Sequence, residues 1–156
     1  MPKKSAGLLL YRESHGEIEV FLVHPGGPFW VNRDKGVWSI PKGEFSEEKP
    51  LEAAKREFNE ETGFTIDGKF TPLNPIKQSS MKVVYAWVVK GDIDADAIRS
   101  NTFSIEWPNG SGNIREFPEV DKAGWFPVKL ARQKILSGQM KLLDQFMNLL
   151  IKKNKD

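Results

Sequence analysis

Apolar residues recur along this chain mainly in short runs, and most of these runs are bounded by glycine, proline or charged residues. Alternating or continuous apolar positions are typical of β-strands. The pattern predicts strands over residues 5–12, 18–23, 37–40, 64–66, 71–78, 82–89, 102–107, 116–119 and 123–126. The first two are separated by His15-Gly16 and are expected to form a hairpin. Residues 82–89 are apolar at almost every position, which indicates a strand that is covered on both faces.

Helical spacing of apolar residues appears in three further segments. It predicts helices over residues 50–62, 128–136 and 139–152, followed by a charged tail over 153–156. Pro50 suits the first position of a helix, and Gly63 suits the left-handed position that ends one. Helices before, between and after strands predict an α/β fold, and the length fits one domain over residues 1–156.

Three glutamates lie close together on the first predicted helix. At 100° per residue, Glu57, Glu60 and Glu61 fall within one sector of about 100°. The same wheel places this sector beside the apolar positions Ala54 and Phe58. Like charges at this spacing destabilise a helix by roughly 0.2–0.5 kcal/mol per pair, and burial adds to the cost. Carboxylates are preferred ligands of hard divalent cations, so the cluster predicts a metal site, with a solvated acidic face as the alternative.

The region that contains these glutamates resembles the signature box of the Nudix hydrolases. The family pattern is G-x5-E-x7-R-E-U-x-E-E-x-G-U, in which U is a bulky apolar residue. The matching residues are Gly43, Glu48, Arg56, Glu57, Phe58, Glu60, Glu61, Gly63 and Phe64. The chain departs once, because four residues instead of five separate Gly43 from Glu48. The resemblance implies a Nudix-type α/β/α sandwich with a mixed sheet.

The resemblance also implies roles for residues of the box. Glu57, Glu60, Glu61 and the Gly43 carbonyl would bind Mg²⁺ or Mn²⁺, and Glu57 and Glu60 would also serve catalysis. Arg56 precedes Glu60 by one helical turn and can reach it. The resemblance implies that Arg56 orients a carboxylate of the box. The alternatives are a surface ion pair for Arg56 and an ordinary turn for Gly43.

Residues outside the box complete the candidate site. Lys42 could contact phosphate or be an ordinary surface lysine, and Trp30 could stack on a nucleobase or pack on its own loop. Nudix enzymes often add a carboxylate from a distant loop. Glu119 is the preferred candidate, with Glu116 and Glu106 as alternatives.

Composition limits the compartments and the kinds of binding site that the sequence favours. The chain has no cysteine, which excludes disulfides and cysteine metal sites and favours a reducing compartment such as the cytoplasm. No apolar run approaches the ~20 residues of a membrane-spanning helix. The net charge of +2 gives little support for a polyanionic partner.

The resemblance therefore implies hydrolysis of a nucleoside diphosphate linked to a further group. Nucleoside triphosphates and dinucleoside polyphosphates are the leading substrate classes. The proline that follows the box in ADP-ribose hydrolases of the family has no counterpart in residues 77–80. The alternatives are an RNA 5′-end pyrophosphohydrolase and a non-catalytic nucleotide-binding module. The chain is expected to be a monomer or a homodimer.

Overall fold

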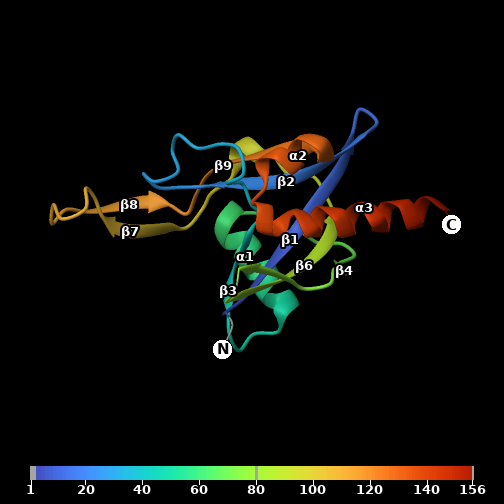
Figure 1. Cartoon of the computed structure of the whole chain (residues 1–156), viewed down its shortest axis with the longest axis horizontal. Coiled ribbons are helices and arrows are strands. Elements are labelled where there is room, and N and C mark those ends of the chain that lie inside the picture. The colour runs from blue at the N-terminus through green and yellow to red at the C-terminus, as the bar shows by residue number, and fades with distance from the viewer. Residues whose placement is uncertain (1–2, 80, 156) are drawn as a thin grey trace.

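A mixed β-sheet forms the centre of the computed structural model, which describes residues 3–79 and 81–155 (Figure 1). Its strands are β1 (Lys3–Ser14), β2 (Glu17–Pro25), β3 (Lys42–Phe45), β4 (Thr71–Pro72), β5 (Ile76–Ser79), β6 (Lys82–Lys90) and β9 (Val120–Pro127). The order is β4-β6-β1-β2-β9, with β3 paired to β1 and β5 paired to β6. The pairing of β1 with β6 is parallel and the others are antiparallel, so the sheet is mixed as predicted.

Helices cover both faces of this sheet. They are α1 (Pro50–Thr62), α2 (Val128–Lys134) and α3 (Met140–Lys155). Side chains alternate along β1, so Leu8 and Leu10 pack with α1 residues, whereas Leu9 packs with α2 and α3 residues. The α/β/α sandwich expected from the sequence is therefore confirmed.

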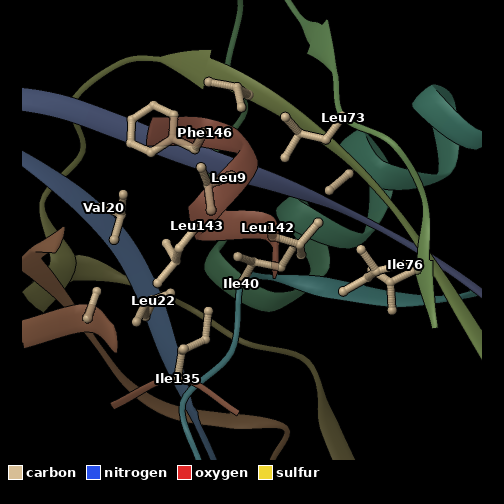
Figure 2. Close-up of a cluster of buried hydrophobic side chains, with 14 of the residues drawn as sticks. Leu9, Val20, Leu22, Ile40, Leu73, Ile76, Ile135, Leu142, Leu143 and Phe146 are labelled. Atoms are coloured by element: carbon tan, nitrogen blue, oxygen red, sulfur yellow. The ribbon is translucent and has the colours of Figure 1, made fainter. Parts of the chain in front are cut away.

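The core between the sheet and α3 is shown in Figure 2. Leu142, Leu143 and Phe146 of α3 are fully buried there. They lie against Leu9 of β1 and Leu22 of β2. Burial of a side chain of this size stabilises the fold by roughly 1.5–3 kcal/mol. This packing fixes the start of α3 and the turn before it against the sheet.

Helix α1 begins and ends where the sequence predicts. Pro50 is its first residue, and Gly63 ends it with φ = 80°, donating its N–H to the Asn59 carbonyl at 2.7 Å. The buried side chains of Ala54 and Phe58 attach the helix to the sheet. The acidic edge of α1 is thereby brought next to β3.

The strand predicted over residues 37–40 is wrong, because β3 begins at Lys42. Ser39 exchanges two backbone hydrogen bonds with Val23, at 2.8 and 3.0 Å, whereas Trp38 bonds the backbone of residues 134 and 136. Successive residues thus have different partners and form isolated bridges. The signature glycine, Gly43, consequently lies inside a strand opposite Ala6.

Other boundaries differ from the pattern. Residues 64–66 form no strand, because the Phe64 backbone bonds the side chains of Thr62 and Asn59 in α1 while the apolar side chains of Phe64 and Ile66 pack against the core. The predicted strand over 71–78 is divided into β4 and β5. Helix α2 ends two residues earlier than predicted and is followed by a 3-10 turn, η2 (Ser137–Gln139). Helix α3 extends into the expected tail as far as Lys155, and residue 156 lies outside the described part.

A separate hairpin projects from the main sheet, at the end opposite the C-terminus (Figure 1). It consists of β7 (Thr102–Glu106) and β8 (Ile114–Pro118), and β8 begins earlier than the predicted strand. A short 3-10 turn, η1 (Ala95–Ala97), precedes it. The rings of Phe29 and Trp107 meet edge to face at 5.2 Å between centroids, which joins the hairpin to the loop after β2.

Among the helices in residues 3–79 and 81–155, none is long and apolar enough to span a bilayer.

Candidate active site

Gly43 and Glu57 meet where β3 faces α1. Glu57 is only 8% exposed, and its carboxylate lies directly against the Gly43 backbone. A Cβ atom at position 43 would overlap this carboxylate. Glycine is therefore required here for space, and it leaves the strand backbone open to the acidic edge of α1.

Arg56 joins three carboxylates of the box. Its Nη1 donates to Glu57 Oε1 at 2.7 Å and to Glu60 Oε2 at 3.0 Å, so the predicted contact with Glu60 is present. Its Nε and Nη2 donate to Glu48 at 2.9 and 2.6 Å. These bonds hold the pKa of Glu48 below its ordinary value. Glu48 thus reaches Arg56 although the preceding loop is one residue shorter than the family pattern.

Glu61 and Lys42 are both half-buried and lie next to each other in the site. The Lys42 backbone N–H donates to Glu61 Oε1 at 3.3 Å. Burial raises the pKa of Glu61 to about 8, and the nearby charge of Lys42 offsets this only in part. Burial also lowers the pKa of the Lys42 ammonium group. Both groups are thus biased toward their neutral forms while no further charge is bound.

Glu119 approaches the helix carboxylates from the loop between β8 and β9. Its backbone is held on both sides, because its N–H donates to the Asn101 carbonyl at 2.8 Å and its carbonyl accepts from the Gly26 N–H at 2.9 Å. Burial, and then the charge of Glu60, raise the pKa of Glu119. Burial likewise raises the pKa of Glu57, to which the charges of Glu60 and Glu119 contribute. The four carboxylates are therefore close enough to repel one another.

The two alternative carboxylates lie elsewhere, in the projecting hairpin. Glu116 pairs with Ser104 across the hairpin, and Glu106 accepts a hydrogen bond from the Gly110 N–H at 2.6 Å. The structure thus brings Glu119 to the acidic cluster and leaves Glu116 and Glu106 outside it.

A pocket of about 250 Å³ adjoins the cluster. Trp30, Lys42, Glu61 and Glu119, which the sequence singles out in four separate segments, all line it. Its remaining walls are Val23, Pro25, Val37, Ser39, Val120 and Leu136. Trp30 is 37% exposed, so its ring is available at the pocket wall. The pocket therefore combines an apolar wall with ionisable groups at one end.

Two buried polar residues that sequence reasoning did not assign to the site hold its walls. The His24 ring is within 2.8 Å of an Asp121 carboxylate oxygen and 2.5 Å of the Arg33 carbonyl, which anchors the loop that carries Trp30. The Gln139 side chain accepts from the Ile40 N–H at 3.1 Å and fixes the segment before Lys42. Gln139 lies 99 residues from Ile40, and no local pattern indicates this contact.

The residues present fit a hard divalent cation. Among the described residues, no three His, Cys, Asp or Glu side chains converge closely enough to ligate an ion as they stand, and Arg56 bonds oxygens of Glu57 and Glu60. The donors are nevertheless all oxygen, and carboxylates with raised pKa values gain from a nearby positive ion. The close contact of Glu57 with Gly43 also brings the strand backbone next to these donors.

Comparisons with known proteins agree with this architecture. A family model described as the NUDIX domain matches residues 1–146. No curated protein matches the chain.

Several solved structures share the fold. A C. elegans Ap4A hydrolase in a binary complex has a TM-score of 0.68 and 23% identity, with 96% of this chain and 98% of that chain covered. The NUDIX domain of Shewanella oneidensis NrtR, complexed with ADP ribose, has a TM-score of 0.68 and 16% identity, with 96% and 89% covered. A mutT/nudix family protein from Listeria innocua has a TM-score of 0.65 and 18% identity, with 98% and 97% covered. With the family model spanning nearly the whole length, this chain belongs to the Nudix family.

Proposed function

We propose that this protein is a divalent-metal-dependent pyrophosphohydrolase that cleaves a phosphoanhydride bond in a nucleoside diphosphate derivative. The Nudix domain and the solved Nudix structures with the same fold support its assignment as such an enzyme. One observation carries the proposal. Trp30, Lys42, Glu61 and Glu119 all line the same pocket, which lies beside the carboxylates that Arg56 holds.

The oxygen donors of α1 and β3 would hold the cation. We assign Glu57, Glu60, Glu61 and the Gly43 carbonyl to this role, with Mg²⁺ or Mn²⁺ as the ion. Bound there, such an ion neutralises charge on phosphoryl oxygens and lowers the pKa of a water molecule.

The protein's own side chains supply position and proton transfer. Arg56 fixes Glu57 and Glu60 relative to each other, a task that suits a guanidinium with several donors in one plane. Lys42 lines the pocket beside Glu61 and can pair with a phosphate oxygen. Glu119 faces the same pocket, and the upward direction of its pKa shift suits a proton acceptor.

The leading substrates are nucleoside triphosphates and dinucleoside polyphosphates. The half-exposed Trp30 and the apolar wall offer a surface for a nucleobase, next to the groups that suit phosphate. A C. elegans Ap4A hydrolase shares the fold, which is consistent with the second class. A non-catalytic nucleotide-binding module is less favoured, because all three helix carboxylates and their arginine are present.

The test is product release from a panel of nucleotides in Mg²⁺ or Mn²⁺. The panel contains triphosphates, diadenosine polyphosphates, ADP-ribose, nucleotide sugars and 5′-triphosphorylated or capped RNA. We expect turnover of triphosphates or dinucleoside polyphosphates that stops when EDTA is added. Preferred turnover of RNA would select the RNA alternative, and nucleotide binding without any turnover would select the non-catalytic one.

A further inference from the structure

A second cavity lies between the sheet and the C-terminal half of α3. Its volume is about 430 Å³, larger than the pocket beside the carboxylates. It is lined by Tyr11, Lys69, Thr71, Val88, Lys90, Phe146, Leu149, Leu150, Lys152 and Lys153. These residues come from β1, β4, β6, α3 and the segment before β4. Figure 1 shows α3 continuing toward the C-terminus beyond the sheet, away from the hairpin.

This cavity is separate from the candidate active site. The two share no lining residue. Val88 and Phe146 belong to the cluster on the α3 side of the sheet, whereas α1 and its carboxylates lie on the other side. Figure 2 places Phe146 beside Leu9 at one end of this cluster. A ligand of the second cavity would therefore not compete directly for the carboxylate site.

The floor of the cavity is apolar and partly aromatic. The half-buried ring of Tyr11 supplies the aromatic surface, and it packs on the fully buried ring of Phe146 at 4.9 Å between centroids. Val88 of β6 also lines the cavity. Leu149 and Leu150 of α3 pack against the edge of the core and are only half-buried, so part of each side chain faces the cavity. The floor thus offers a contact surface for a flat or apolar group.

The rim has a single sign of charge. Lys69, Lys90, Lys152 and Lys153 surround the floor, and none of the ten lining residues is acidic. None of the four lysines forms an ion pair with a residue in the described part of the chain. Lys152 and Lys153 lie in the last turns of α3 and complement its negative end, whereas Lys69 and Lys90 come from other segments and meet them at the same cavity. Gathered positive charge of this kind favours an anionic occupant.

We propose that this cavity binds a small aromatic phosphate of about mononucleotide size. A flat ring would lie on the half-buried side chains of Tyr11, Leu149 and Leu150, and the phosphate would lie among the lysines, which bind phosphate as point charges. The volume falls within the range of roughly 300–1,000 Å³ that is usual for small-molecule sites. This proposal concerns binding alone and does not depend on the proposed hydrolysis.

The test is calorimetric titration of AMP into the full chain in EDTA and low salt, where hydrolysis plays no part. Lys69→Gln/Lys90→Gln removes half of the rim charge. Lys129→Gln/Lys141→Gln is the matched control, because both lysines are exposed and neither lines the cavity. Trp30→Ala alters the other pocket. Adenosine has the ring without the phosphate and so tests the phosphate. Decanoate is an apolar anion without an aromatic ring and so tests the ring.

Without a cation, the carboxylates of the pocket that Trp30 lines repel a phosphate, so in EDTA we expect only the second cavity to bind AMP, at one AMP per chain. The affinity should be about tenfold lower in Lys69→Gln/Lys90→Gln, from the loss of charged contacts. The control and Trp30→Ala should stay within about twofold of the wild type, and adenosine should bind at least tenfold more weakly than AMP. Loss of binding in Trp30→Ala alone, equal binding of adenosine, preference for decanoate or no AMP binding at millimolar concentration would each overturn the proposal.

Discussion

The protonation of Glu61 offers a quantitative test of the buried end of the site. Burial raises its pKa to about 8, from an ordinary value of 4.5. In the metal-free protein at pH 7, roughly one Glu61 in ten is therefore ionised. Because the ordinary value applies in the unfolded chain, the folded state holds a proton that the unfolded state has released between pH 4.5 and 8.

The sign of the stability effect follows from this difference. The folded state binds more protons in that window, so the free energy of unfolding of the metal-free protein decreases as the pH rises from 4.5 to 8. The limiting slope from one group is about 1.4 kcal/mol per pH unit. Glu61→Gln removes the ionisation, so its stability should vary less with pH across the same window.

Binding of a divalent cation should favour the ionised form of Glu61 over the protonated form. A divalent ion requires the ionised carboxylate, so binding near pH 7 should release about one proton from Glu61. The affinity for Mn²⁺ should consequently rise by about tenfold per pH unit below pH 8 and level off above it. In Glu61→Gln the affinity should be lower and its dependence on pH shallower.

Two measurements check this account. Carboxyl ¹³C NMR of the metal-free protein should show one glutamate that titrates near pH 8 and is missing in Glu61→Gln. Calorimetry of Mn²⁺ binding in buffers of different ionisation enthalpy should report the released proton. A Glu61 midpoint near 4.5, or equal Mn²⁺ affinity at pH 6.5 and 8, would refute the reasoning.

Three further substitutions test other parts of the structure. Arg56→Lys retains the charge but cannot bond Glu48, Glu57 and Glu60 together, so kcat/KM should fall by about tenfold to a hundredfold. Arg115→Lys in the hairpin should leave kcat/KM unchanged, and equal effects of the two substitutions would show that the contacts of Arg56 have no special role. Glu119→Gln should lower kcat strongly and Glu116→Gln should not, because of these two residues only Glu119 lines the pocket. The reverse result would show that the carboxylate supplied from outside the box is Glu116 of the hairpin. Phe146→Ala should lower the free energy of unfolding, measured by urea denaturation, by about 3–5 kcal/mol. Phe29→Ala should change it little, because Phe29 is 57% exposed. A small decrease for Phe146→Ala would mean that α3 is not packed as described.

The local features of the box could be predicted from sequence because each depends on residues close together in the chain. Pro50 and Gly63 set the two ends of α1 through their own backbone preferences. The spacing of one helical turn brings Arg56 to Glu60. The alternation in β1 and β2 likewise follows from the two-residue period of a strand.

The features that the sequence could not supply depend on distant contacts. Trp38 bonds the backbone after α2 and its neighbour Ser39 bonds β2, so an apolar run that resembles a strand becomes two isolated bridges. Leu136 reaches the pocket wall only because the turn after α2 lies beside Trp38. Gln139 holds the segment before β3 from the far end of the chain.

Glu119 illustrates the boundary between these two cases. Sequence reasoning names three carboxylates in one stretch, and local pattern does not separate them. The fold separates them, because backbone bonds to Gly26 and Asn101 hold Glu119 at the acidic cluster while Glu106 and Glu116 remain in the hairpin.

The most direct test of the central claim compares two glutamates of the same helix. Turnover of the preferred nucleotide in Mg²⁺ is measured for the wild type, Glu60→Gln and Glu52→Gln. Glu52 is the control because it is exposed and, within the described residues, forms an ion pair only with Lys55. The account predicts that Glu60→Gln loses nearly all turnover and that Glu52→Gln retains it. Full activity in Glu60→Gln, or equal loss in both variants, would contradict a catalytic role for the carboxylates gathered at Arg56.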